Sequence, residues 1–292
     1  MQEFQIGGTS ADARNEGERL MATFRTHAER HASAAETFRC FAPDVEPERI
    51  AASFARRQGA LGSMAFDVVG DMWARPQLNR RDRSLLVISV LAAQARDEEL
   101  EAHTAIGRRN GLTGEEIEEI VLHVAAYAGF PAAMHASRKV DAGLRRFEGV
   151  EALPERQAAG RKSDAERDRD GADVLRSIAG VTHPIDSAMG LARMEERYGE
   201  VGVVAYRWAF GEIWSRPQLS RRDRSIVVIA ILVSLGAVAE LAVHAPAGLR
   251  HGLSRVEVEE IVTHLSLYAG IPRAIEAMGA VRAAWAKLDD SK

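Results

Sequence analysis

The segment Trp73–Ser84, WARPQLNRRDRS, occurs again as WSRPQLSRRDRS at Trp214–Ser225. The copies lie 141 positions apart, and ten of their twelve residues are identical. The similarity continues at the same offset, because HTAIGRRNGLTGEEIEEIVLHVAAYAGFP from His103 matches HAPAGLRHGLSRVEVEEIVTHLSLYAGIP from His244. Self-similarity over this length indicates a duplicated domain rather than a solenoid of short repeats.

Both copies have helical patterns. Behind each arginine-rich segment, an N-cap residue stands three positions before an aspartate (Asn79 and Asp82, Ser220 and Asp223), which predicts a capping box ahead of a long apolar helix. The next helix begins with a second capping box in each copy, and its apolar residues have helical spacing. The pairs are Thr113 with Glu116 and Ser254 with Glu257, and Gly129 and Pro131 are expected to end the first of these helices.

We predict helices at about 13–38 and 47–73 ahead of the first core and at about 172–213 ahead of the second. The fold class is therefore all-α, with two tandem domains of about five or six helices each. The segment Glu155–Asp173 is highly charged and predicts an exposed linker that continues into the next helix. The expected units are a first domain at 1–155, a charged linker at 156–172 and a second domain at 173–292.

Composition excludes several classes of protein. The chain of 292 residues is 46% hydrophobic and 27% charged, as in globular proteins, and its net charge of −4 gives no basic patch for nucleic acid. Its one cysteine, Cys40, cannot form an intrachain disulfide, and the N-terminal residues lack the apolar core of a secretory signal. The longest apolar run, Ile226–Ala239, is too short to cross a bilayer. We expect a cytoplasmic protein that binds neither membrane nor nucleic acid.

The first candidate group is a glutamate four residues before a histidine, Glu99 with His103 and Glu240 with His244. This spacing puts both side chains on one helical face, where the carboxylate is expected to raise the pKa of the imidazole for general acid–base catalysis. A surface ion pair is the alternative. Two such pairs could also hold a metal ion between the domains, but the sequence has no recognised metal motif and we expect none.

A second repeated pair places a tyrosine four residues after a histidine in an apolar helix. The pairs are His123 with Tyr127 and His264 with Tyr268. Each predicts either a buried histidine satisfied by its neighbours or the lining of a pocket.

Arginines near a helix N-terminus are the third candidate group. Arg83 and Arg224 are predicted to clamp an anion, while Arg81 and Arg222 are expected to be solvated. Arg109 and Arg250 are weaker candidates. Trp73 and Trp214 are predicted to be hydrophobic anchors rather than cofactor contacts.

RRDRS, E-x-x-x-H and H-x-x-x-Y-A-G-x-P follow one another in this order in each copy. With them, the stretch from RPQLNRRDRS to AAYAGFPAA resembles the carboxymuconolactone decarboxylase family, whose helical fold is shared with the alkylhydroperoxidase (AhpD-like) group. The peroxidase branch has Cys-x-x-Cys where this chain has Arg96 and Glu99, and Ala237 and Glu240. Without this thiol pair, the resemblance is to the decarboxylase branch.

The resemblance implies decarboxylation of a small carboxylated lactone, or a related acid, without a cofactor. The implied roles are proton donation by His103 and His244, poised by Glu99 and Glu240. Arg83 and Arg224 would bind the substrate carboxylate, and Tyr127 and Tyr268 would hydrogen-bond the lactone, with His123 and His264 lining the site.

Two departures leave alternatives open. Members of the decarboxylase branch are usually single domains that form rings, often of six; a tandem chain would give a homotrimer with six domains. The copies also differ near the expected pocket, at Thr104 and Ala245, Arg108 and Leu249, Asn110 and His251, and His135 and Glu276. The chain could therefore be a tailoring isomerase, cyclase or oxidoreductase in specialised metabolism, or a ligand-binding protein without catalysis.

Overall fold

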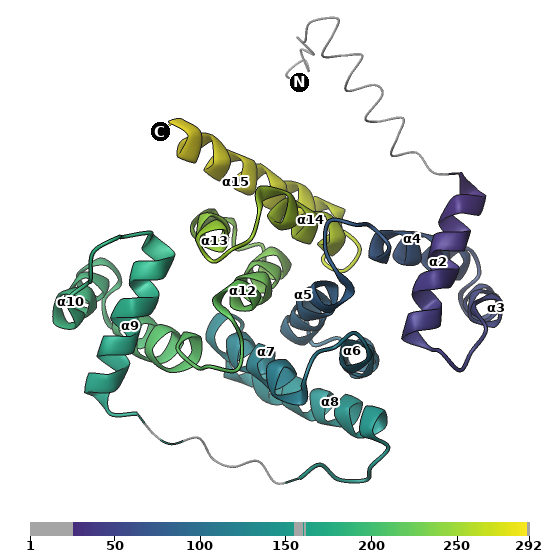
Figure 1. Ribbon diagram of the computed structural model, residues 1–292, viewed down its shortest axis with the longest axis horizontal. Coiled ribbons are helices and arrows are strands. Elements are labelled where there is room, and N and C mark those ends of the chain that lie inside the picture. The colour runs from purple at the N-terminus through teal and green to yellow at the C-terminus, as the bar shows by residue number, and fades with distance from the viewer. Residues whose placement is uncertain (1–25, 155–159, 161, 291–292) are drawn as a thin grey trace, which may run out of the picture. The chain divides into compact units, whose positions relative to one another are not determined.

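The computed structural model describes residues 26–154, 160 and 162–290, and within these ranges every regular element is a helix (Figure 1). The predicted all-α class with tandem helical repeats is confirmed. The described residues belong to two compact units, one ending at Arg75 and the other beginning at Pro76. Helix labels follow Figure 1 and begin at α2.

Among its described residues, the first unit contains three helices, α2 (His27–Phe41), α3 (Pro47–Gln58) and α4 (Ala60–Trp73). The helix predicted at about 13–38 is observed from His27 to Phe41, and residues 13–25 lie outside the described residues. The single helix predicted at 47–73 is wrong: the chain breaks at Gly59, whose φ of 59° is readily adopted only without a side chain. The break lets α4 return over α2, where Phe66 stacks on Phe38 with 4.7 Å between ring centroids.

The second unit holds the remaining helices of both repeats. The first repeat contributes α5 (Arg80–Ala93), α6 (Asp97–Arg109), α7 (Gly114–Tyr127) and α8 (Phe130–Glu148). The second contributes α9 (Asp164–Ala179), α10 (Ser187–Tyr198), α11 (Glu200–Val204), the π-helix η1 (Ala205–Trp214), α12 (Arg221–Leu235), α13 (Val238–Arg250), α14 (Arg255–Leu265) and α15 (Ile271–Asp290).

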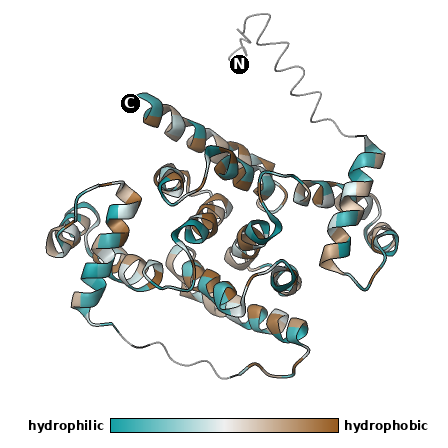
Figure 2. Ribbon diagram, in the orientation of Figure 1, coloured by the Kyte–Doolittle hydropathy of each residue, from teal (hydrophilic) through white to brown (hydrophobic). Residues whose placement is uncertain are grey.

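The core of the second unit is built on α5 and α12, the two helices that follow the duplicated segment. They pack against each other, and nearly all their residues are buried (Figure 1). Helix α7 packs on both α5 and α12, and so does α14. The outer helices carry both hydrophobic and hydrophilic residues, as expected for amphipathic helices (Figure 2). The two repeats thus share one hydrophobic core in this unit.

The helices ahead of the second core lie where the sequence predicts them, but there are more than two of them. The expected linker gives way to α9 at Asp164, where Ser163 and Glu166 form a capping box. Over the predicted range 172–213 the chain forms the rest of α9, then α10, α11 and most of η1. The boundaries 1–155, 156–172 and 173–292 stay a prediction, as does the number of chains in an assembly.

All four predicted N-cap residues cap their helices, but only two of the four capping boxes are complete. Thr113 with Glu116 and Ser254 with Glu257 make complete capping boxes. At α5 and α12, Asn79 and Ser220 accept the backbone N–H of Asp82 and Asp223. These two aspartates do not complete the boxes, because their carboxylates receive arginines of the opposite repeat.

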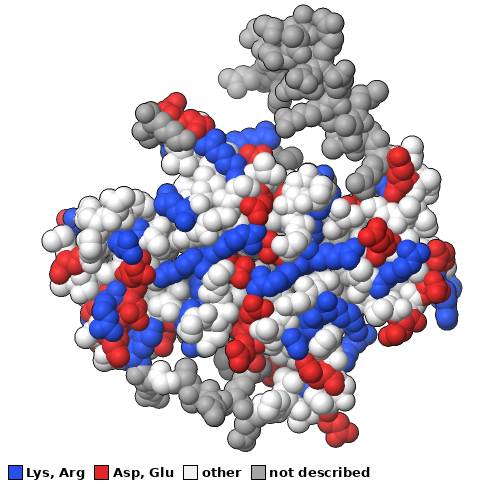
Figure 3. All heavy atoms as spheres, in the orientation of Figure 1, with Lys and Arg blue, Asp and Glu red and all other residues white. Residues whose placement is uncertain are grey.

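Arg81 and Arg222 form these cross-repeat contacts. Across the repeats, Arg222 donates to Asp82 at 2.7 Å and Arg81 donates to Asp223 at 3.0 and 3.2 Å. Within its own repeat each also donates to a glutamate at 2.5 Å, Arg222 to Glu257 and Arg81 to Glu116. The expectation that these arginines are simply solvated is wrong. Figure 3 shows basic side chains across the middle of one face with acidic side chains beside them. The duplicated RRDRS segment thus ties the two repeats together.

Among the described residues, no helix combines the length and the apolar composition that crossing a lipid bilayer requires.

Candidate active site

The buried part of the candidate site is built around Arg224 of α12. Its side chain is fully buried and donates to Glu119 of α7 at 3.1 Å, and also to the backbone carbonyls of Ile213, Arg216 and Leu219. Arg216 adds a second cation to Glu119 at 2.5 Å. Burial lowers the pKa of Arg224, and the charge of Glu119 opposes that shift. The guanidinium is therefore held by protein acceptors.

His123 is the third member of this buried group. Its Nδ1 lies 2.8 Å from the carbonyl oxygen of Glu119. A carbonyl only accepts, so Nδ1 carries the hydrogen and Nε2 faces the guanidinium of Arg224 at 3.5 Å. Burial, and then the charge of Arg224, lower the pKa of His123 to about 3.

The matching group uses the opposite repeats. Arg83 of α5 donates to Glu260 at 2.9 Å and to His264 Nδ1 at 2.7 Å, and all three side chains are buried. Each arginine thus reaches the α7 or α14 helix of the other copy. Arg224 faces Nε2 of His123, whereas Arg83 faces Nδ1 of His264, so the two groups are related without being identical.

Three aromatic or imidazole side chains meet next to His123, whose ring lies 5.6 Å from that of Trp214. The indole Nε1 of Trp214 donates to the Tyr127 hydroxyl at 2.9 Å, and that oxygen lies 3.4 Å from His244 Nε2. The Trp214 ring stacks on His244 at 5.9 Å, and Tyr127 meets His244 edge-on. Because the indole can only donate, the Tyr127 hydroxyl hydrogen is directed elsewhere, toward His244 or a ligand. We call this group the His244 site.

The second group is the His103 site. His103 of α6 meets Tyr268 edge-on at 5.9 Å, and Tyr268 stacks on His264 at 5.6 Å. Tyr127 lies within α7, whereas α14 ends at Leu265 and Tyr268 follows in a turn. Each site takes its E-x-x-x-H histidine from one repeat and its H-x-x-x-Y pair from the other. The structure therefore brings together the predicted histidines and tyrosines in two sites that span the repeats.

The prediction that a neighbouring carboxylate raises the pKa of His103 and His244 is wrong, because the pKa of both is lowered. Glu99 and Glu240 are exposed, at the first turns of α6 and α13. Burial lowers the pKa of His103 and of His244 to about 4, and nearby His251 adds to the shift at His244. Burial also raises the pKa of Tyr127, and the charge of Glu240 raises it further. Near pH 7 the imidazoles and the phenol are therefore neutral.

Glu119 and Glu260 are the residues that sequence reasoning missed. Each stands four positions before His123 or His264, so each repeat contains a second E-x-x-x-H. Both glutamates fall within an apolar helical stripe, and both are buried. The sequence signal that could have found them is a carboxylate on the apolar face of a helix in both repeats, because a buried carboxylate needs a partner.

The residues that differ between the copies mostly make structural contacts. Asn110 donates to Ser84 at 2.9 Å, whereas His251 takes that place against Ser225 at 2.8 Å. Arg108 lies over Phe147, and His135 pairs with Asp97. Arg109 and Arg250, which match between the copies, also make structural contacts, Arg109 near Phe147 and Arg250 with carbonyls of α9. Of the differing residues, Thr104 and Ala245 directly follow His103 and His244, and His251 has its ring 5.9 Å from Trp214.

Within the described ranges, no group of three or more histidine, cysteine or acidic side chains has the arrangement of a metal site. Two surface hollows are lined by other residues, one near His27 and His31, the other near Asp141 and Arg145.

Comparison with known proteins finds the same family in both repeats. The model of the carboxymuconolactone decarboxylase family matches residues 60–142 and 204–283, one region in each repeat. A 4-carboxymuconolactone decarboxylase of Acinetobacter baylyi is 36% identical over 116 residues, covering 40% of this chain and 84% of the relative. A nitrosuccinic acid decarboxylase of Metarhizium robertsii is 30% identical over 109 residues, covering 37% of this chain and 74% of the relative.

The first prediction concerns the buried ion pair. Replacing Glu119 by Gln should lower the free energy of unfolding by about 3 kcal/mol, because it leaves the buried charge of Arg224 without its carboxylate. Urea unfolding at pH 7 measures this. The exposed Glu196→Gln should change stability by less than about 0.5 kcal/mol. Equal stabilities for the two variants would contradict the proposed importance of the pair.

The second prediction concerns the loss of stability at low pH that His244 causes. Unfolded His244 binds a proton near pH 6.5, but the folded protein does so only near pH 4. Between these values the unfolded state holds more protons, so stability falls as the pH falls. Replacing His244 by Gln should therefore shrink the stability difference between pH 7 and about pH 4.5 by about 2 kcal/mol. Urea unfolding at both pH values tests this, with the exposed His183→Gln as control. An unchanged difference would contradict the lowered pKa.

Proposed function

Because the chain belongs to the carboxymuconolactone decarboxylase family, we propose that it removes carbon dioxide from a small carboxylated lactone or a related acid by general acid–base catalysis. Both relatives are named as decarboxylases, one of 4-carboxymuconolactone and one of nitrosuccinic acid. The observation that carries the proposal is the buried His244 beside the Tyr127 hydroxyl.

The reaction consumes one proton. The bond between the carboxylate carbon and its neighbour breaks, CO2 leaves, and the electron pair stays on the substrate carbon, where an adjoining electron-withdrawing group holds it. A proton then adds to that carbon. The site must accordingly tolerate a carboxylate, stabilise the transient anion and supply the proton.

Neutral surroundings support the first of these tasks. A substrate carboxylate that binds against Trp214, Tyr127 and His244 moves from water to a site that is uncharged in the free protein near pH 7. The site is uncharged because burial keeps both the imidazole and the phenol neutral. The free site therefore offers the carboxylate no charged imidazole until a proton is taken up. The cations Arg224 and Arg83 are engaged with Glu119 and Glu260, and we assign them a supporting role.

The Tyr127 hydroxyl is oriented to stabilise the transient anion. Its oxygen accepts from Trp214, which leaves its hydrogen to donate to an oxygen of the substrate. A neutral imidazole can also donate such a hydrogen bond. At the His103 site, Tyr268 and His103 are given the same tasks.

The proton comes from the imidazole once the substrate is bound. In the free protein burial keeps His244 neutral, but a carboxylate brought beside it favours the charged form and raises the pKa again. His244, and likewise His103, would take up a proton on binding and pass it to carbon. Glu240 and Glu99, exposed at the first turns of their helices, can exchange the proton with solvent. We propose that no cofactor takes part, so EDTA should leave turnover unchanged.

Replacing His103 and His244 together by Gln should abolish release of CO2 from 4-carboxymuconolactone while the helical circular dichroism stays intact. Each single variant should retain turnover at the other site if both work. His183→Gln, at an exposed position outside both sites, is the matched control. Full activity of the double variant would refute the assigned roles, and no turnover by the unmodified protein would refute this substrate.

Binding of a dicarboxylate should be coupled to proton uptake. Succinate has two carboxylates but no group that activates decarboxylation, so it serves as a probe. Calorimetric titrations at pH 6.5 in buffers of different ionisation enthalpy should give a positive proton uptake, which disappears in the double histidine variant. Binding without net uptake would mean that the imidazoles stay neutral in the complex.

A further inference from the structure

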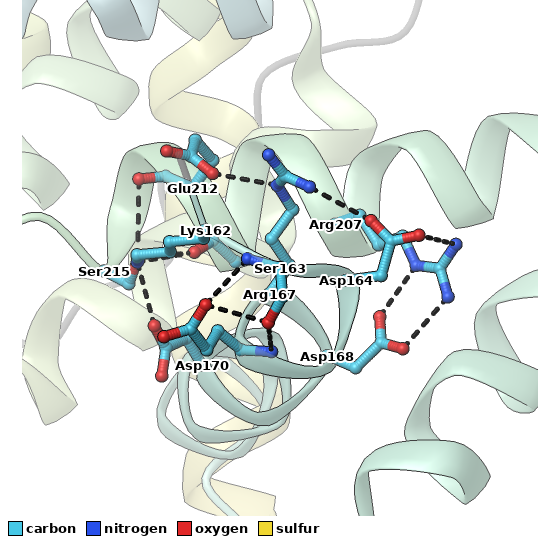
Figure 4. A network of polar contacts seen from close by, with 11 residues as sticks. Lys162, Ser163, Asp164, Arg167, Asp168, Asp170, Arg207, Glu212 and Ser215 are labelled. Atoms are coloured by element: carbon cyan, nitrogen blue, oxygen red, sulfur yellow. Dashed lines mark hydrogen bonds and ion pairs between the residues drawn. The ribbon is translucent and has the colours of Figure 1, made fainter. Parts of the chain in front are cut away.

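The π-helix η1 carries Trp214, whose indole orients Tyr127 in the His244 site. π-helical segments are rare and frequently occur at functional sites. Helix α9 packs closely on η1, since a Cβ atom at Gly211 would lie 2.3 Å from the carbonyl oxygen of Arg167. Two ion pairs join the same elements, Arg167 with Glu212 at 2.9 Å and Arg207 with Asp168 at 2.8 Å (Figure 4).

Lys162 holds the end of η1 from the segment between the repeats. Its ammonium donates to Ser215 Oγ at 2.6 Å, to the Gly211 carbonyl at 2.9 Å and to Asp170 at 2.8 Å (Figure 4). These bonds use all three hydrogens of the ammonium. Ser215 is the residue after Trp214, and its own hydroxyl also donates to the Gly211 carbonyl at 2.7 Å.

A second cation holds the same turn from the other side. Arg224 donates to the carbonyls of Ile213 and Arg216, which flank Trp214 along the chain. The backbone on both sides of Trp214 is therefore fixed by two cations, Arg224 from the core and Lys162 from outside the repeat core. Between them they set the position from which the indole donates to Tyr127.

The two repeats support this helix end differently at one position. Thr26 and Glu29 cap α2 as Ser163 and Glu166 cap α9, so these two helices correspond at an offset of 137, and the sequence has Arg25 for Lys162. A polar pair between the corresponding helices is also present in the first repeat, His31 with Asp67 at 2.8 Å. The residue after the tryptophan, however, is Ala74 in the first repeat and Ser215 in the second, so only the second has the hydroxyl to which Lys162 donates.

We propose that Lys162 is a positioning residue of the His244 site, which fixes the end of η1 and thereby the hydrogen bond from Trp214 to Tyr127. Its effect on catalysis rests on the proposed decarboxylation, whereas its effect on Trp214 does not. The segment that joins the repeats thus contributes a side chain to the ordering of the His244 site.

The test uses the full chain labelled with 15N at its tryptophans. Lys162→Met should shift the indole N–H resonance of Trp214, assigned with Trp214→Phe, and speed its exchange with solvent. The indole resonances of Trp73 and Trp285 should stay in place. Lys162→Arg, which keeps the charge and several donors, should restore much of the original signal. Lys139→Met, a surface change on α8, is the matched control and should leave Trp214 unaffected.

Turnover gives a second readout on the same variants. With His103 replaced by Gln, so that only the His244 site works, Lys162→Met should lower kcat about tenfold with little change in KM, as expected when a catalytic group is misplaced. If Lys162→Met does not fold, Asp170→Asn, which removes the carboxylate partner of Lys162, should give a smaller shift of the same resonance.

A folded Lys162→Met or Asp170→Asn variant with the Trp214 resonance and its exchange unchanged would overturn the proposal. Absence of decarboxylation by the unmodified protein would count against the proposed function alone, because the resonance of Trp214 is measured without substrate.

Discussion

A buried guanidinium must have a carboxylate partner, and here that partner comes from the other repeat. Arg83 and Arg224 are fully buried, and neither could remain charged inside the core without Glu260 or Glu119. The sequence supplies each glutamate on the α7 or α14 helix of the opposite copy. The surface contacts of Arg81 and Arg222 repeat the same crossed pattern. The requirement to pair four arginines across the pseudo-symmetric core therefore fixes how the two repeats pack.

The crossed packing also determines where the two candidate sites lie. The glutamates that accept from the buried arginines stand on the same segments as His123, Tyr127 and their counterparts, so the ion pairs bring these side chains to His244 or His103 of the other repeat. A single repeat cannot form a complete site. Duplication within one chain supplies both contributions and allows the two sites to diverge, as they have at Asn110 and His251.

The sequence was sufficient for the helical class, the duplication and the N-cap residues, and it singled out the histidines and tyrosines that the structure brings together. It could not reveal which residues meet, because the partners of Arg83 and His244 lie more than a hundred positions away along the chain. It also misjudged the electrostatics of Glu99 and His103. Spacing places a carboxylate on the same helical face, but the pKa of the imidazole depends on how much water the folded protein removes, and burial outweighs an exposed neighbour. The break at Gly59 was missed because apolar spacing continues through it.

In the proposed decarboxylation, the buried imidazoles are uncharged until the substrate enters. A site that kept His244 protonated in its resting state would bind carboxylates strongly and stabilise the reactant as well as the transition state, with little gain in rate. A site that is neutral until an anion enters obtains its proton only in the complex where that proton is used. This arrangement requires the indole, phenol and imidazole to be held in place without help from the ligand. That task falls to the rigid surroundings of Trp214, where Arg224 and Lys162 fix the backbone.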